Sequence, residues 1–137
     1  MRRQILAGLL LVLLSLTGPV GADEVEKVLF IVVDGDDVIA SNTKAGRFDR
    51  LKLSAKERIQ DYTVANAVAL VVTNQRYVAY GVLGGGWQSL RRRAQEKTEN
   101  IEVQDYSATV VTSDRILNFY GRTGTWNETS RSKFSFN

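Results

Sequence analysis

The stretch Val64-Ala65-Asn66-Ala67-Val68-Ala69-Leu70-Val71-Val72-Thr73-Asn74-Gln75-Arg76 decides the fold, because its pattern occurs again from Val103 onward. The interval from Val64 to Val103 is called the repeat length. Nine of 29 positions are identical between residues 64–92 and 103–131, where chance would give about two. The identities include Thr73 with Thr112, Arg76 with Arg115, Gly85 with Gly124, and Trp87 with Trp126. A weaker match one repeat length upstream places Phe48 where the tryptophans stand. The sequence therefore predicts one supersecondary unit present three times.

Each unit is expected to contain short strands separated by turn residues such as Asp34-Gly35-Asp36-Asp37. The expected strands are 28–33, 38–42, 48–54 and 58–64, then 68–73, 76–83, 87–93 and 100–103, then 107–112, 115–121 and a strand opened by Trp126. The third unit is expected to stop before a full fourth strand. We expect no helix over 51–60, because the equivalent stretch 91–96 lacks an apolar face of helical period.

The first strand of a unit is apolar at successive positions, as in Leu29-Phe30-Ile31-Val32-Val33 and Val68-Ala69-Leu70-Val71-Val72. Both faces of such a strand must be buried. Propeller blades bury both faces, because each sheet packs between two neighbours. The sequence therefore predicts an all-β fold of three tandem four-stranded propeller-like blades of about 39 residues each, with a β-trefoil as the alternative.

A family resemblance supports this interpretation. Val110-Val111-Thr112-Ser113-Asp114-Arg115-Ile116-Leu117, followed by Thr123-Gly124-Thr125-Trp126, resembles the blade repeats of kelch and quinoprotein-like β-propellers. The resemblance covers residues 25–131 and implies a propeller fold without implying a ligand or cofactor. Propellers typically have 4–8 blades, so three blades cannot close a ring. We expect two apolar end faces, and hence self-association into a six-blade homodimer or assembly with another propeller fragment.

Residues 1–22 are predicted to be an export signal, which leaves 23–137 as the mature domain. Two arginines precede an apolar run from Ile5 to Leu16, and small residues stand before Asp23. The run is shorter than the roughly 20 residues that cross a bilayer, so an uncleaved anchor is only the alternative. We expect a secreted or periplasmic protein with no membrane contact after cleavage.

The charge of the mature chain gives no reason to expect nucleic acid as a partner. Removing Arg2 and Arg3 leaves 16 Lys and Arg residues against 15 Asp and Glu residues, a net charge of +1. The chain also has no histidine and no cysteine, so the usual general base, thiol nucleophile and commonest metal ligands are missing. We therefore expect a protein that is not an enzyme and has no cofactor or metal.

The alternative is an exported hydrolase that depends on carboxylates or Ca²⁺. Asp34, Asp36 and Asp37 are close enough together to offer oxygen ligands to Ca²⁺. The same positions in the other units hold turn residues, so the cluster is more simply a hairpin turn.

Four residues are candidates for ligand binding. Trp87 and Trp126 could stack on a sugar, as in lectins with propeller folds, although Phe48 in the equivalent position favours packing. Arg76 and Arg115 could bind an anionic group, although each could simply border a solvated hairpin. The expected function is an exported non-enzymatic binding or scaffolding module with a carbohydrate or protein ligand.

Overall fold

The computed structural model describes residues 26–132, which form eleven strands in three antiparallel sheets. The first sheet contains β1 (Leu29–Asp34), β2 (Asp37–Asn42) and β3 (Arg47–Lys52). The second contains β4 (Ile59–Val64), β5 (Val68–Thr73), β6 (Arg76–Gly81) and β7 (Gly86–Arg91). The third contains β8 (Thr98–Val103), β9 (Ser107–Thr112), β10 (Arg115–Tyr120) and β11 (Thr125–Ser130). The all-β prediction is confirmed.

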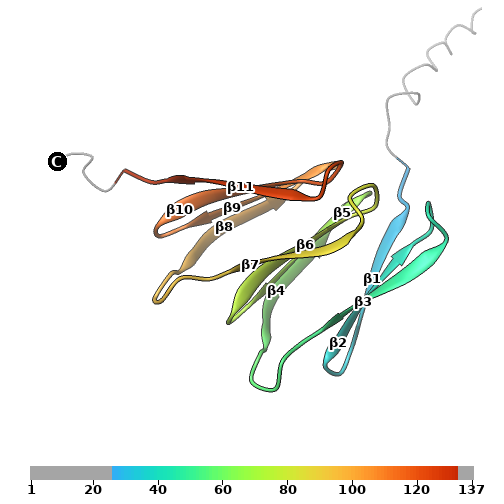
Figure 1. Ribbon diagram of the computed structural model, residues 1–137, viewed down its shortest axis with the longest axis horizontal. Helices are drawn as coiled ribbons and strands as arrows, with labels where there is room; N and C mark the ends of the chain where they lie inside the picture. The colour runs from blue at the N-terminus through green and yellow to red at the C-terminus, as the bar shows by residue number, and fades with distance from the viewer. Residues whose placement is uncertain (1–25, 133–137) are drawn as a thin grey trace, which may run out of the picture.

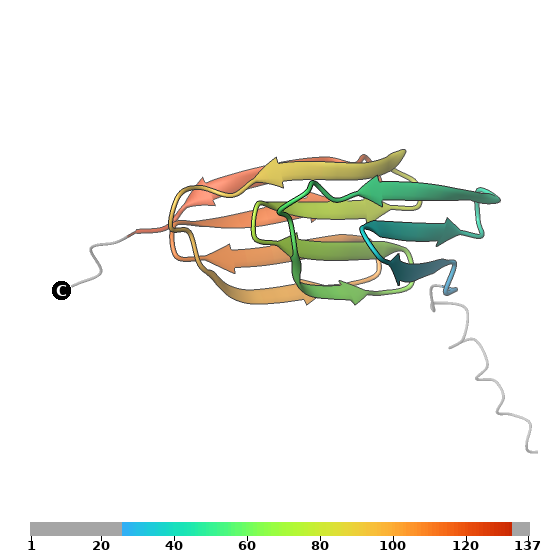
Figure 2. The same ribbon diagram turned by 90° about the horizontal axis from the view of Figure 1, so that it is seen from below.

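The sheets are stacked as three layers, with the second sheet between the other two (Figure 1). Figure 2 shows the same layers face on, with their strands running in similar directions. Each sheet is built from strands that are consecutive in the chain. The last strand of the first sheet, β3, contacts the last strand of the second sheet, β7, and the first strands β1 and β4 likewise contact each other. The chain therefore leaves the first sheet at one edge and crosses to the opposite edge to enter the second. The stack does not close into a barrel, so the β-trefoil alternative is wrong.

Burial follows the position of a sheet in the stack. All six residues of β5 are buried, because the second sheet is covered on both faces. Its side chains alternate between clusters shared with the first sheet and a cluster shared with the third. The prediction of a strand buried on both faces is thus confirmed for Val68–Thr73. It is wrong for β1, where Phe30 and Val32 are 45% and 53% exposed, because no sheet covers that side among residues 26–132.

The grouping of strands into sheets differs from the expected grouping by one strand. We expected 58–64 to complete the first unit, but β4 pairs with β5 and opens the second sheet. Likewise β8 pairs with β9 and opens the third sheet. The third sheet therefore has four strands, and the three-stranded sheet is the first, in which the outer edge of β1 pairs with no strand within residues 26–132.

Recurring glycines fit the turns between the last two strands of each sheet. Gly46, Gly85 and Gly124 follow one another at the repeat length and have φ values of 71°, 89° and 73°. This left-handed region is strained for residues that carry a Cβ, which explains why glycine recurs at this turn.

Two sequence predictions concern the ends of the chain and its relation to a membrane. The export signal at 1–22 falls outside residues 26–132. Within residues 26–132, no helix is long and apolar enough to cross a membrane.

Candidate functional site: two arginine clusters between the sheets

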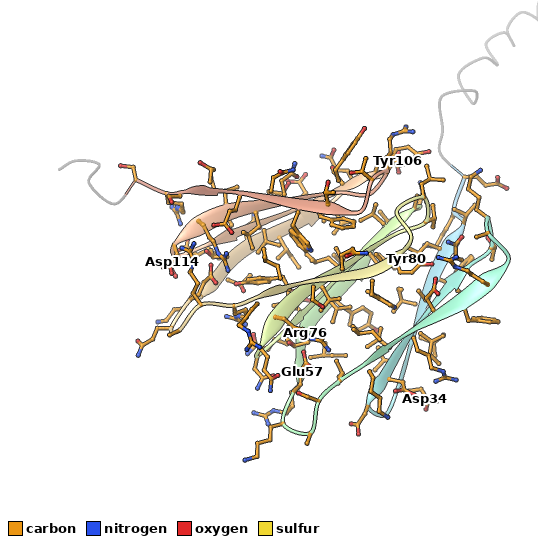
Figure 3. All side chains as sticks on the ribbon, viewed as in Figure 1. Asp34, Glu57, Arg76, Tyr80, Tyr106 and Asp114 are labelled. Atoms are coloured by element: carbon orange, nitrogen blue, oxygen red, sulfur yellow. The ribbon has the colours of Figure 1, made fainter. Side chains whose placement is uncertain are left out.

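Arg76 lies where the first and second sheets meet, at the start of β6 (Figure 3). Its Nε donates to Glu57 Oε2 at 2.7 Å and its Nη2 donates to Glu57 Oε1 at 3.1 Å, a two-point ion pair. Nη2 also donates to the Lys52 carbonyl at 3.0 Å, and Nη1 donates to Ser89 Oγ at 3.0 Å. Arg76 therefore ties its own sheet to the loop that arrives from the first sheet.

Arg115 makes the corresponding contacts between the second and third sheets. Its Nε and Nη2 donate to Glu96 at 2.8 and 3.0 Å, and Nη2 also donates to the Arg91 carbonyl at 2.9 Å. Each of these partners stands one repeat length after its counterpart in the Arg76 cluster. One partner differs in kind, because Arg115 Nη1 donates to the Glu128 carboxylate at 2.7 Å, where Arg76 meets a serine hydroxyl.

A threonine at the end of the preceding strand completes each cluster. Thr73 Oγ1 donates to Glu57 Oε2 at 2.6 Å and accepts from the backbone N–H of Arg76 at 3.0 Å. Thr112 does the same with Glu96 and Arg115, at 2.6 and 3.0 Å. The recurring threonine thus caps the hairpin turn and anchors the buried carboxylate at the same time.

The two buried glutamates are held in their charged form. Burial raises the pKa of Glu57, but hydrogen bonds from Arg76, Thr73 and the Ser54 backbone outweigh it and lower the pKa to about 2. For Glu96 the same opposition of burial against hydrogen bonds, chiefly from Arg115, also lowers the pKa to about 2. Both carboxylates are therefore permanent ionic anchors at neutral pH.

The tryptophan side chains pack between sheets. The Trp87 indole N–H donates to the Asp49 carbonyl in the first sheet at 3.1 Å, and the ring lies edge-on to Tyr80 at 5.2 Å between centroids. The Trp126 indole N–H donates to the Gln88 carbonyl at 3.0 Å, and its ring lies 5.3 Å from Phe119. These contacts favour a packing role for both tryptophans, and sugar binding by either ring stays a prediction.

Ligand binding by Arg76 and Arg115 also stays a prediction, but the two arginines are not equally accessible. The Arg115 side chain is 4% exposed, because Glu128 and Glu96 both cover its guanidinium. The Arg76 side chain is 26% exposed. The structure therefore gives Arg115 a buried structural position and leaves part of Arg76 open to a pocket.

The first sheet has no such cluster among its described residues. Asp34 and Asp37 occupy the positions that correspond to Thr73 and Arg76. Asp37 pairs with Arg50 at 2.8 Å and Lys52 at 3.4 Å on the neighbouring strand. Within residues 26–132, no group of three or more acidic side chains is arranged to hold a metal ion.

Acids of the three sheets lie apart from one another. Asp34, Glu57 and Asp114 are well separated in Figure 3. Glu57 and Glu96 each pair with an arginine of a different sheet. These acids therefore lie in separate parts of the stack, and a carboxylate-dependent activity stays a prediction.

Sequence reasoning did not identify Glu57 and Glu96 as functional partners. Both stand 19 residues before the arginine with which they pair, and one repeat length separates them. The sequence therefore contains the recurrence of this glutamate at the repeat length. It lies outside the window 64–92 over which the units are compared.

Comparisons with known proteins place the chain in no family. No protein-family model and no curated protein matches it. A solved structure with some similarity is the N-terminal domain of Nup159, with a TM-score of 0.41 and 15% sequence identity. The match covers 77% of this chain and 31% of that chain, so the chain spans less than a third of the length of the Nup159 domain.

Proposed function

We propose that the chain is an exported, non-enzymatic scaffolding or binding module of propeller-like blades that assembles with a second copy through the outer face of its first sheet. The apolar part of this outer face is Phe30, Val32, Ile39 and Phe48. The same three cross-strand rows also carry polar and charged residues, namely Ser41, Arg50, Asp34, Asp37 and Lys52. Export rests on the predicted signal at 1–22.

The observation that carries the proposal is the solvent exposure of Phe48. Its counterparts Trp87 and Trp126 each pack against the preceding sheet in the stack. Phe48 is 74% exposed, because no sheet precedes the first within residues 26–132. A large aromatic ring at a position that elsewhere forms an interface favours burial by a partner.

Three further residues of the same face support this interpretation. Val32 and Ile39 correspond to Val71 and Val78, which are fully buried between the first and second sheets. Phe30 corresponds to the buried Ala69, so at this position the outer face presents a larger apolar side chain than its internal counterpart. Fully burying a side chain of this kind contributes about 1.5–3 kcal/mol, which is enough for several of them to favour a dimer.

The outer face of the third sheet, at the other end of the stack, is more polar, which favours pairing through two first sheets. The outer face of the third sheet carries Ser107, Thr109 and Asn118 where the second sheet has the buried residues Val68, Leu70 and Ala79. The expected apolar character of this end is therefore interrupted by polar groups. A six-blade ring would have to pack those groups against Phe48, whereas two first sheets can bring their apolar side chains together.

Sedimentation analysis of the exported chain tests the proposal. We expect a dimer at about 10–100 µM, an ordinary range for an interface of modest affinity. Phe48→Glu should give a monomer, because it places a charge within the apolar part of the interface. Asn118→Arg, on the outer face of the third sheet, should remain a dimer.

Two results would count against the proposal. A wild-type chain that stays monomeric throughout this range excludes self-association. Dissociation by Asn118→Arg as well as by Phe48→Glu would show that both end faces take part, as a closed ring requires.

A further inference from the structure

The pocket beside Arg76 has a counterpart beside Arg115, and there the Glu128 side chain fills the space. Glu128 occupies the position one repeat length after Ser89. Its carboxylate lies between two arginines, at 2.7 Å from Arg115 Nη1 and 3.0 Å from Arg93 Nη2. The third sheet therefore shows how a carboxylate fits against an arginine of this kind.

At Arg76 the equivalent carboxylate is replaced by the short hydroxyl of Ser89. The space that this leaves is a pocket of about 470 Å³, lined by Ser54, Glu57, Gln75, Arg76, Ser89 and Arg91. Its volume lies within the range of small-ligand sites, about 300–1,000 Å³. The pocket is open to solvent, because Ser89 and Arg91 on β7 are both exposed.

The charges that line the pocket favour an anion. Arg76 and Glu57 neutralise each other in their two-point pair. Arg91 faces Arg76 across the β6–β7 ladder and makes none of the ion pairs formed among residues 26–132. The positive charge of Arg91 is thus not balanced by an ion pair, and it lies beside Arg76, whose Nη1 donates to the Ser89 hydroxyl. The Glu128 carboxylate likewise lies beside two arginines, Arg115 and Arg93.

We infer that Arg76, Arg91 and the hydroxyl of Ser89 form a binding site for a carboxylate. The ligand takes the place that the Glu128 side chain occupies beside Arg115. Two guanidinium groups suit this ligand because their planar N–H donors match the two oxygens of a carboxylate. The site is independent of the proposed assembly, since it lies between the first and second sheets and not on an outer face.

The same chemistry could come from a free dicarboxylic acid or from a glutamate side chain of a peptide. Titration of the full chain with succinate, and separately with acetyl-Gly-Glu-Gly-amide, distinguishes the two sources. The Gln form of the peptide is the control for charge. We expect one site per chain for at least one of the two carboxylate probes and no binding of the Gln peptide.

Two substitutions test the site itself. Ser89→Glu supplies the carboxylate from within the chain, as residue 128 does, and should weaken probe binding at least tenfold. Arg91→Ser, which copies the residue at position 130, should also weaken it at least tenfold. Both positions are exposed on β7, so both variants should fold, as a tryptophan emission spectrum unchanged from wild type would show.

The reverse exchange provides a gain of binding. Glu128→Ser uncovers Arg115 and leaves Arg93 without its carboxylate partner, and should raise the number of bound probes from one to two. The inference is overturned if neither probe binds at about 20 mM, well above ordinary ligand affinities. It is also overturned if Ser89→Glu and Arg91→Ser leave the affinity of the probe unchanged.

Discussion

At the scale of single residues, the Glu57 carboxylate stabilises the fold by remaining ionised. Its side chain is 1% exposed and paired with Arg76, and its pKa lies near 2 against an ordinary value of 4.5. A depressed pKa contributes stability that is complete above the unfolded value and is lost as the pH falls toward the folded value. For this group the loss occurs between about pH 4.5 and pH 2 and amounts to about 3 kcal/mol.

We expect Glu57→Gln to lower the free energy of unfolding by about 3 kcal/mol at pH 7, because it removes a buried, ionised carboxylate and leaves the partly buried Arg76 without its counter-ion. The variant should also lose part of the acid dependence of the wild type between pH 4.5 and pH 2. Urea unfolding at several pH values measures both effects. Glu99→Gln removes an exposed pair with Arg131 and should change stability by less than about 1 kcal/mol. An unaltered acid dependence in Glu57→Gln would contradict the assignment.

Single residues could be predicted from the sequence where their identity recurs. Thr73, Arg76 and Trp87 were identified because each has an identical residue one repeat length later. Their contacts could not be predicted, because the partners come from another part of the stack. Glu57 reaches Arg76 only after the chain has crossed from one layer to the next.

At the scale of strands and sheets, two glycines set how closely the second and third sheets approach. A Cβ at Gly81 would overlap the backbone carbonyl of Gly121, and a Cβ at Gly84 would lie 2.8 Å from the Gly124 Cα. Gly81 does not require a left-handed conformation, so the reason for glycine at this position is space. The backbones therefore touch where β6 and β10 end.

We expect Gly81→Ala to destabilise the protein by about 3 kcal/mol, because the sheets must move apart or the backbone must shift. Gly35→Ala is the matched control. Gly35 has φ of 62° with no atom near its added Cβ, so the control measures conformational strain alone, about 1–2 kcal/mol. Thermal unfolding compares the two variants. A smaller loss for Gly81→Ala than for Gly35→Ala would show that the close approach is not required.

The strands themselves were mostly predicted from turn residues and apolar runs, but their partners were not. The strand at 58–64 was assigned to the first unit because it follows 48–54 in the chain. It pairs with β5 instead, and its mixed polar and apolar sequence carries no signal of that choice. Strand pairing depends on how the chain crosses between layers, which local composition does not specify.

At the scale of the whole molecule, the second sheet forms the centre and the two outer sheets differ from each other. The continuous apolar sequence of β5 predicted correctly that a sheet is covered on both faces. The polar groups on the outer face of the third sheet were missed, although Ser107 and Thr109 already break the apolar run at the equivalent strand. Among the described residues, the outer face of the third sheet mixes these polar groups with the exposed side chains of Ile116 and Tyr120, whereas that of the first sheet exposes Phe30 and Phe48. The proposed pairing therefore uses the first sheet.

Amide hydrogen exchange should follow this order of layers. We expect the slowest exchange in β5 and β6, since all but one of their residues are buried and opening them disrupts both interfaces. Exchange in β1 and β2 should be faster at low protein concentration and should slow as the concentration rises through the dimerisation range, because a second copy would cover Phe30 and Phe48. Exchange in β9 and β10 should not depend on concentration. Protection that rises equally in the first and third sheets would instead indicate contact at both ends, and concentration-independent protection of β1 would exclude pairing through this face.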